Sequence, residues 1–290
     1  MKPAPFRLHV PSTVDEATEL LAEHGDEAKV LAGGQSLVPL LALRLARFEH
    51  LVDLNRVDGL RAIAQGDGWL TVGAMTRQSE AEASAEVATA VPLLHRALPH
   101  IGHFQIRNRG TVGGSTAHAD PASELPAVAL ALDAEMIGTS ASGTRTIAAR
   151  DFFDSMWMTA LEPDELLTSV RYPVWPGRSG FAVDEFARRS GDFAIAGVCC
   201  GVQLGEDDHI ARAAIALFGM GSTPIRADAA ERQLAGHLPE DVDLGAVASI
   251  AVNDTEPADD LHGSAAFRRR VASQLIERAL ARAIEEASHG

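Results

Sequence analysis

Two segments of the chain place a Gly-Gly pair where an extended stretch meets a helix, and they constrain the fold more than any other feature. The first is Leu31-Ala32-Gly33-Gly34-Gln35-Ser36-Leu37, which joins a short apolar strand to a leucine-rich helix. The second is Thr111-Val112-Gly113-Gly114-Ser115. Because glycine has no Cβ, the backbone at each pair can approach a ligand or another backbone closely.

The start of a helix also leaves N–H groups unsatisfied and pointing outward. Each glycine segment therefore predicts a neutral cradle for an anion such as phosphate, and Ser36 adds a hydroxyl group to the first. Two such cradles in one domain suit a diphosphate. Taken singly, a Gly-Gly pair is more often only a tight turn, and neither segment matches the Walker A or GxGxxG pattern. The residues alone predict a phosphate-bearing ligand, with a dinucleotide as one candidate.

The first glycine segment lies inside a predicted β-α-β unit. Thr13 and Glu16 fit a capping box at the start of a helix that ends at Gly25. A strand over Lys29–Ala32, a helix through the following leucines and a strand over Leu51–Leu54 complete the unit. Strands joined in this way are parallel, with a right-handed crossover.

The middle of the chain predicts strands joined by tight turns. Gly66-Asp67-Gly68 separates two short apolar strands and indicates a hairpin. The remaining expected elements are a helix over Glu86–Leu98, a helix that ends near Leu132, and strands over Glu135–Gly138 and Leu166–Pro173.

The segment Trp175–Gly180 is rich in proline and glycine and is the expected domain linker. Beyond it, strands over Val183–Ala187, Ala194–Leu204 and Ile210–Leu217 precede three helices near 227–236, 242–252 and 264–287. This order predicts a small antiparallel sheet with helices on one face. Arg268-Arg269-Arg270, in the last helix, is expected to be a solvated face that could meet an acidic partner.

The charge and the cysteines exclude several classes of function. The chain has 25 Lys and Arg against 40 Asp and Glu, a net charge of −15, which opposes nucleic acid and anionic membranes. Its two cysteines, Cys199 and Cys200, are neighbours, too few for an iron–sulfur cluster or a cysteine-based zinc site. The longest apolar run, Ala194–Val202, is too short to span a bilayer, and the start lacks a signal peptide. A cytoplasmic protein is expected.

Three motifs in order carry a resemblance to a known family. They are Ala32–Leu37, then Ile106–Ser115 with the following Ala119-Asp120-Pro121 and Glu124-Leu125-Pro126, and finally Arg188–Ala194. In these motifs the chain resembles the FAD-binding medium subunit of molybdenum hydroxylases, the xanthine dehydrogenase and carbon monoxide dehydrogenase medium-chain family. The resemblance runs from near Phe6 to the final helix.

The resemblance implies an α+β protein. Its FAD-binding domain, residues 1–176, would have the two-lobed vanillyl-alcohol-oxidase (PCMH) type of fold. We call about 1–56 lobe one and about 57–176 lobe two. Residues 180–288 would form a small C-terminal domain of antiparallel sheet and helices, of the carbon monoxide dehydrogenase flavoprotein type.

The resemblance also assigns a role to each residue of the FAD site. Leu31–Leu37 and Thr111–Ser115 would bind the diphosphate from two sides. Asp120 and Glu124 would lie beside the cofactor as acceptors for ribose or adenine. Leu167 would pack near the adenine, Ile101 would approach the ring system and Phe193 would lie near the isoalloxazine.

By the same resemblance the chain is the electron-transfer subunit of a heterotrimer, in which a large molybdopterin subunit and a small subunit with [2Fe–2S] clusters supply the other redox groups. A dimer of such heterotrimers is expected. Two alternatives stay open: a free-standing flavin-dependent oxidase or reductase, and a non-catalytic nucleotide-binding module that serves assembly.

The residues suggest two other kinds of site, a metal site and a hydrolase triad. His100, His103 and His118, with Asp120, offer metal ligands, but they fall in the expected cofactor segment. Ser115, His118 and Asp120 suggest a hydrolase triad, yet no GxSxG elbow is present. We expect no metal ligand and no catalytic residue in this chain, and His118 is a candidate to hydrogen-bond near the flavin.

Overall fold

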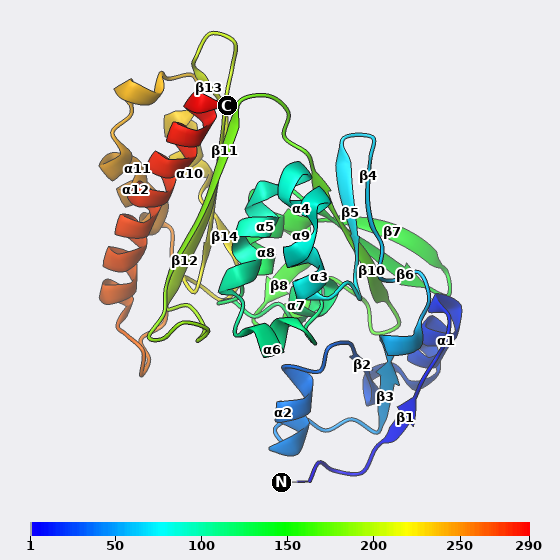
Figure 1. Ribbon diagram of the computed structural model, residues 1–290. Coiled ribbons are helices and arrows are strands. Elements are labelled where there is room, and N and C mark those ends of the chain that lie inside the picture. The colour runs from blue at the N-terminus through cyan, green and yellow to red at the C-terminus, as the bar shows by residue number, and fades with distance from the viewer. Residues whose placement is uncertain (1) are drawn as a thin grey trace.

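A computed structural model describes residues 2–290, so Met1 lies outside the described residues. Its larger sheets have three, five and four strands in chain order. In Figure 1 the N-terminal sheet is at the lower right, the five-stranded sheet above it, and the last sheet at the left beside the red C-terminal helix. Among residues 2–290, no helix combines the length and the apolar composition that crossing a bilayer requires.

Lobe one is a small parallel sheet in the order β1-β3-β2. Its elements are β1 (Arg7–His9), α1 (Val14–His24), β2 (Ala28–Leu31), α2 (Leu37–Ala42) and β3 (His50–Asp53), with 3₁₀ turns at Gly25–Glu27 and Leu54–Arg56. The parallel β-α-β unit is confirmed, and β1 is a strand that the sequence analysis missed. The Thr13 hydroxyl accepts from the Glu16 N–H (3.1 Å), but Glu16 caps Ser12 N–H (2.7 Å), so the predicted box is only half formed.

Lobe two contains the antiparallel sheet β4-β5-β10-β6-β7. Its strands are β4 (Ile63–Gly66), β5 (Trp69–Gly73), β6 (Glu135–Ser140), β7 (Gly143–Ala148) and β10 (Leu166–Pro173), and a separate pair is β8 (Phe153–Ser155) and β9 (Met158–Thr159). The β4–β5 hairpin is confirmed. Asp67 and Gly68 both have positive φ (51° and 79°), the conformation that a two-residue turn matching the strand twist requires.

Short helices cover this sheet: α3 (Gln78–Ala83), α4 (Ala85–Ala90), α5 (Pro92–Ala97), α6 (Phe104–Arg107), α7 (Val112–His118), α8 (Glu124–Ala131) and α9 (Ala149–Phe152), with a 3₁₀ turn at Leu98–His100. The single helix expected over Glu86–Leu98 is wrong. Val91 has φ −137° and ψ 71°, because the following Pro92 excludes the helical conformation before it and starts a new helix instead.

The C-terminal domain holds the antiparallel sheet β11-β12-β13-β14. Its elements are β11 (Ser179–Phe186), β12 (Ala196–Leu204), β13 (Ile210–Phe218), β14 (Ile225–Arg226), α10 (Asp228–Leu234), α11 (Leu244–Asn253) and α12 (Ala265–His289), with a 3₁₀ turn at Pro239–Asp241. One sheet face packs on α10–α12 and the other on helices of lobe two. Cys199 and Cys200 accordingly belong to different cores, as alternation along a strand predicts.

The expected linker is packed: Trp175 is only 7% exposed, and its ring lies 5.4 Å from that of Phe181. The expectation of a solvated face is wrong for Arg268, whose guanidinium donates to Ile195 O and pairs with Asp260 (2.6 Å). The domain boundaries themselves stay a prediction.

Candidate functional site

The first glycine segment is an open loop between β2 and α2. Within residues 2–290, the backbone N–H groups of Gly33, Gly34, Gln35 and Ser36 meet no hydrogen-bond acceptor. Ser36 is the N-cap of α2, and its hydroxyl makes no cap bond. All four residues are at least partly accessible to solvent. The loop therefore presents the set of free donors that the sequence predicts for an anion.

The second glycine segment is the first turn of α7, and here the expectation of a second set of free amides is wrong. The N–H of Val112 donates to Thr76 O (3.0 Å) and that of Gly113 to Ala74 O (2.9 Å). The Gly114 N–H donates to the hydroxyl of Thr111, the N-cap (3.0 Å). The donors left on this side are hydroxyl groups, because Thr111 can still donate its proton after accepting and Ser115 has no partner among the described residues.

The structure brings the two segments into contact. A Cβ on Gly33 would overlap the carbonyl oxygen of Arg109 and lie 2.8 Å from the Cα of Gly110. A Cβ on Gly114 would lie 2.6 Å from the Thr111 hydroxyl oxygen and 3.2 Å from the Cβ of Ala32. Glycine is thus required on both sides, because any side chain would push the segments apart.

A side-chain network that the sequence analysis missed holds the two segments together. Asn55 donates from Nδ2 to Ala32 O (3.2 Å), next to the first glycine pair. Arg77 donates to Asn55 Oδ1 (2.6 Å) and also to the carbonyl oxygen of Arg109. One guanidinium therefore joins lobe one to the segment that leads into α7. No motif marks Arg77, which lies 22 positions from Asn55 and 32 from Arg109.

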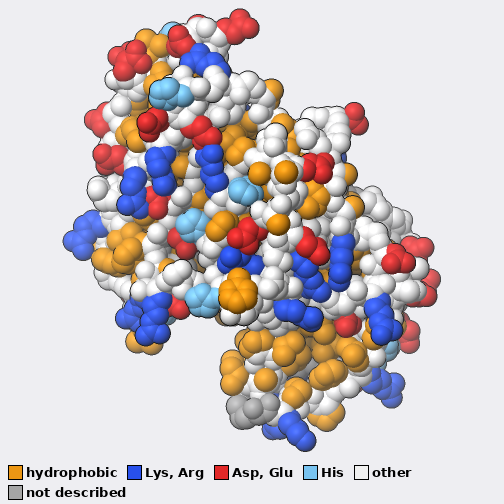
Figure 2. Space-filling model, in the orientation of Figure 1, with side chains coloured by type: hydrophobic (Ala, Val, Ile, Leu, Met, Phe, Trp, Pro, Cys, Tyr) orange, Lys and Arg blue, Asp and Glu red, His pale blue; other side chains and the backbone are white. Residues whose placement is uncertain are grey.

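The junction is electropositive. Burial lowers the pKa of Arg77, and the neighbouring charges of Arg61 and Arg109 lower it further. Figure 2 shows basic side chains where lobe one meets the rest of the molecule. The loops themselves contain no Lys or Arg, either from Ala32 to Ser36 or from Thr111 to Ser115. The positive charge comes from arginines of neighbouring segments. Positive charge here favours a phosphate group over a neutral ligand.

Asp120, Glu124 and His118 lie beyond the second segment. Asp120 is already engaged: its carboxylate accepts from Ala122 N (2.9 Å) and from Trp157 Nε1 (3.2 Å). Burial lowers the pKa of His118 and so favours the neutral imidazole. No hydrogen bond joins Ser115, His118 and Asp120 within the described residues, so the hydrolase triad has no geometric support.

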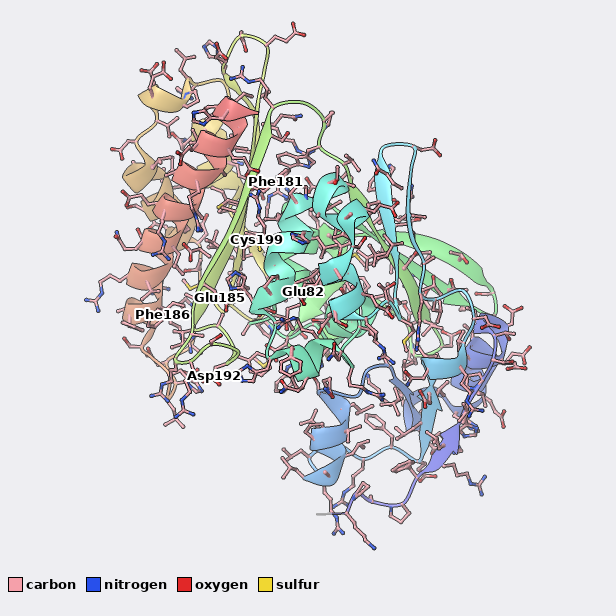
Figure 3. All side chains as sticks on the ribbon, in the orientation of Figure 1. Glu82, Phe181, Glu185, Phe186, Asp192 and Cys199 are labelled. Atoms are coloured by element: carbon pink, nitrogen blue, oxygen red, sulfur yellow. The ribbon has the colours of Figure 1, made fainter. Side chains whose placement is uncertain are left out.

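Glu124 belongs to a buried acidic cluster between lobe two and the C-terminal sheet. Its side chain is 7% exposed, and burial, followed by the nearby charge of Glu185, raises its pKa to about 8. His100 lies 3.4 Å from Glu185, and this contact raises the pKa of His100. Figure 3 shows Glu185 and Cys199 on the part of the C-terminal sheet beside lobe two. Glu124 is thus protonated near neutrality and can donate a hydrogen bond as well as accept one.

The remaining predicted site residues fall into two environments. Ile101 and Leu167 are buried in the core that fills lobe two. Phe193 is 67% exposed, on the loop that precedes β12. This loop reaches lobe two, since a Cβ on Gly191 would lie 2.6 Å from the His103 ring and 3.1 Å from the carbonyl carbon of Gly102. Phe193 and Ile101 are therefore on adjoining segments, and the roles assigned to all three residues stay predictions.

The fold does not bring His100, His103 and His118 together as ligands for a metal ion. Among the described residues, no group of three possible ligands includes His100, His103 or His118.

Comparison with known proteins places the whole chain. Residues 4–175 match the model of the FAD binding domain in molybdopterin dehydrogenase. Residues 181–283 match that of the CO dehydrogenase flavoprotein C-terminal domain.

Full-length relatives agree with these matches. The chain is 44% identical over 287 residues to the 6-hydroxypseudooxynicotine dehydrogenase complex subunit alpha of Paenarthrobacter nicotinovorans, covering 99% of this chain and 97% of that one. It is 37% identical over 280 residues to the carbon monoxide dehydrogenase medium chain of Hydrogenophaga pseudoflava, covering 97% of each.

Solved structures have the same fold. A chain of carbon monoxide dehydrogenase from Hydrogenophaga pseudoflava superposes with a TM-score of 0.96 at 37% identity, covering 99% of both chains. A chain of quinoline 2-oxidoreductase from Pseudomonas putida superposes with a TM-score of 0.93 at 36% identity, again with 99% of both covered. The expected α+β class, an FAD-binding fold followed by a small C-terminal domain, is confirmed.

Proposed function

The chain belongs to the family of FAD-binding medium subunits of molybdenum hydroxylases, and on this premise we propose that it holds FAD where its two glycine segments meet and serves as the electron-transfer subunit of a heterotrimer. The observation that carries the proposal is the set of four free amides in the first loop, beside the Arg77 guanidinium. Such donors suit the diphosphate that FAD carries between its flavin and adenosine parts.

The two segments would bind the diphosphate differently. Gly33 to Ser36 would donate from the backbone, whereas Thr111 and Ser115 would donate from hydroxyl groups. Arg77 would set the spacing between the segments and contribute positive charge. FAD, when bound, supplies the ability to accept electrons singly and to release them singly or in pairs.

The other assigned residues would position the two ends of the cofactor. Asp120 and Glu124 would accept from ribose or adenine, and Leu167 would pack beside the adenine. Ile101 and the exposed Phe193, on adjoining segments, would lie by the flavin ring. An aromatic side chain that is two-thirds exposed in the isolated chain fits a place beside a large planar ligand.

The molybdenum cofactor and the [2Fe–2S] clusters would reside on partner subunits. Both cysteines of this chain are fully buried and lie in separate cores, so they cannot ligate a cluster together. Lobe one also carries an apolar surface of the kind that a partner covers, visible in Figure 2. Val38, Leu43 and Leu45 on it are at least half exposed.

Two measurements test this proposal. Purified protein incubated with FAD and then desalted is expected to keep an absorbance band near ~450 nm. Affinity purification from the source cells is expected to bring down two further chains, one carrying molybdenum and one carrying iron. A protein that never retains flavin would contradict the cofactor assignment, and a flavin-loaded chain that purifies alone would point to a free-standing flavoenzyme.

The apolar surface gives the partner assignment a matched control. Replacing Leu43 and Leu45 by Glu is expected to reduce recovery of the partner chains without loss of flavin. Leu261→Glu, at a 92% exposed position of the C-terminal domain, should leave recovery unchanged. Equal recovery from both variants would show that partners bind elsewhere.

A further inference from the structure

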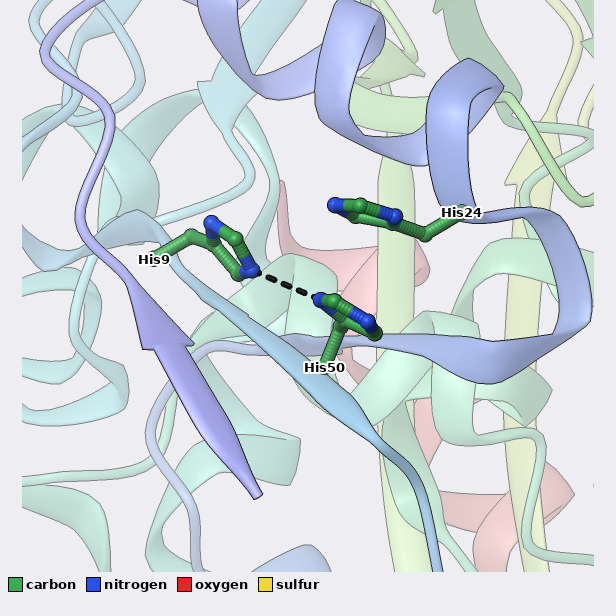
Figure 4. Close-up of side chains that lie close together, drawn as sticks. All are labelled: His9, His24 and His50. Atoms are coloured by element: carbon green, nitrogen blue, oxygen red, sulfur yellow. Dashed lines mark hydrogen bonds between the residues drawn. The ribbon is translucent and has the colours of Figure 1, made fainter.

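Three histidines converge in lobe one, away from the glycine segments (Figure 4). His9 ends β1, His24 ends α1 and His50 begins β3. His9 Nε2 lies 2.8 Å from His50 Nδ1, and the His24 ring stacks on the His50 ring with centroids 3.7 Å apart. One nitrogen from each ring can be chosen so that all three lie within 4.8 Å of one another.

The cluster is sheltered and has carboxylates around it. His50 is 8% exposed, and the His24 side chain is 15% exposed. Glu23 lies 4.0 Å from His24, and Glu27 and Glu49 offer oxygens within 4.8 Å of a His50 ring nitrogen. Carboxylates beside ligating histidines orient the rings and raise their basicity in metal sites.

We propose that His9, His24 and His50 form a binding site for one divalent transition-metal ion, with Zn²⁺ as the ion that suits it. Three imidazoles with a fourth position for water or a carboxylate make a common zinc ligand set. Zinc–nitrogen bonds of about 2.0–2.1 Å in tetrahedral geometry place the ligand nitrogens roughly 3.3 Å apart. The present separations, 2.8 Å between His9 Nε2 and His50 Nδ1 and at most 4.8 Å among the three nitrogens, bracket that spacing, so the rings would turn and the His9–His50 hydrogen bond would open to admit the ion.

The backbone around the cluster also suits a cation. His24 is the last residue of α1, an eleven-residue helix, and the carbonyl end of a helix carries partial negative charge. Mg²⁺ and Ca²⁺, in contrast, prefer oxygen ligands and six or more of them. The site is therefore expected to select zinc or a similar soft ion over magnesium.

The location assigns the ion a structural role. His50 pairs with Ala28 at the start of β2 and with Arg7 in β1, whereas the glycine loop follows the opposite end of β2. β1 is a three-residue edge strand whose one partner, in the part of the chain that the structure describes, is β3. An ion held by all three histidines would fasten β1 and the end of α1 to β3. It would stiffen lobe one without contacting the flavin.

The test uses purified chain without a polyhistidine tag, stripped with EDTA and then titrated with Zn²⁺. We expect one zinc bound per chain and, at free zinc about a hundredfold above the Kd, a rise in Tm of about 5 °C or more. Co²⁺ in place of zinc should give the visible absorption bands of a tetrahedral nitrogen site, and Mg²⁺ should change neither signal.

Variants distinguish this site from adventitious binding by surface carboxylates. His24→Gln and His9→Gln should each weaken zinc binding about tenfold or more and abolish the rise in Tm. His262→Gln, at an exposed position of the C-terminal domain, is the matched control and should bind as wild type does. Circular dichroism and flavin retention confirm that each variant folds. Zinc binding of unchanged strength in folded His9→Gln and His24→Gln, or no binding by wild type, would overturn the proposal.

Discussion

The two glycine segments have similar sequences, a Gly-Gly pair with a serine one or two residues later, but their backbone amides are used differently. In the first, the amides of Gly33 to Ser36 have no acceptor among residues 2–290. In the second, the amides of Val112 to Ser115 all donate within the chain, to Thr76, to Ala74 and to Thr111. Glycine thus permits ligand approach in one segment and close internal packing in the other.

The comparison shows that a shared motif does not imply a shared mechanism. Gly113 is packed against Ala74, and its Cβ would lie 2.6 Å from the Ala74 Cα. That contact and the bond from the Gly113 N–H to Ala74 O fasten the segment to the turn that follows β5. We infer that the second segment supports the site and that the first segment supplies the backbone N–H donors.

The largest expected effect is from Gly114→Val. The valine side chain would clash with the Thr111 hydroxyl and with Ala32, so it would push the second glycine segment away from the first. We expect loss of FAD retention with the secondary structure preserved, measured by absorbance after desalting and by circular dichroism. Gly66→Val is the control, because no atom lies within 4 Å of a Cβ there. Normal flavin content in Gly114→Val would refute the contact between the segments.

Arg77→Gln should have the next largest effect. The variant removes the guanidinium that joins Asn55 to the Arg109 carbonyl oxygen, together with a positive charge. We expect the Kd for FAD to rise about tenfold, which corresponds to about 1.4 kcal/mol. Arg61→Gln removes a nearby charge but only a weak contact to Asn55 O (3.4 Å), so its effect should be smaller. Equal effects would mean that charge alone matters.

Glu124 lies on the side of the second glycine segment. Its raised pKa predicts that the stability of the protein depends on pH. Its pKa is raised to about 8 in the folded protein and is near 4.5 when unfolded, so the folded state binds the extra proton between these values. The contribution of Glu124 to the free energy of unfolding is therefore fully present below about pH 4.5 and is lost as the pH rises toward 8.

Glu124→Gln isolates that effect, because glutamine stays neutral. Thermal unfolding of the flavin-free protein from pH 5 to 8.5 should give similar Tm values for variant and wild type at pH 5. The variant should become progressively more stable than wild type toward pH 8. The pKa of His100 is raised first by its hydrogen bond to Glu185 and to a smaller extent by Glu124, so His100 is present in both proteins and adds only a smaller difference between them. Parallel curves would contradict the buried, protonated state of Glu124.

The smallest effect is expected from Thr111→Val, which removes the N-cap of α7. Loss of the bond from the Gly114 N–H should cost about 1 kcal/mol of folding stability. It should also weaken FAD binding, because a hydroxyl donor disappears. Thr111→Ser keeps the hydroxyl and should restore both properties. If Thr111→Ser is as impaired as Thr111→Val, loss of the hydroxyl alone does not explain the effect.

The sequence predicts much of the architecture because the signals are local. Alternation, turn residues and the leucine pattern identify the β-α-β unit of lobe one, the β4–β5 hairpin and strands such as β10 (Leu166–Pro173). The order of three motifs points to the family. The opposite faces of Cys199 and Cys200 follow from strand geometry alone.

What the sequence could not predict depends on tertiary contacts. Whether the Gly113 amide is free is decided by Ala74, a turn residue 39 positions earlier in the chain. Arg77 acts through partners far along the chain, and Arg268 is buried by its bonds to Ile195 and Asp260. The histidine cluster is invisible for the same reason, since His9 and His50 are 41 positions apart.

A crystal structure of the chain with FAD bound tests the central claim most directly. The claim predicts that diphosphate oxygens lie within about 3.2 Å of at least two of the backbone nitrogens of Gly33 to Ser36. It also predicts that the amides of Gly113 and Gly114 keep their bonds to Ala74 and Thr111. A diphosphate bound by the amides of the second segment, with those of the first left free, would contradict it.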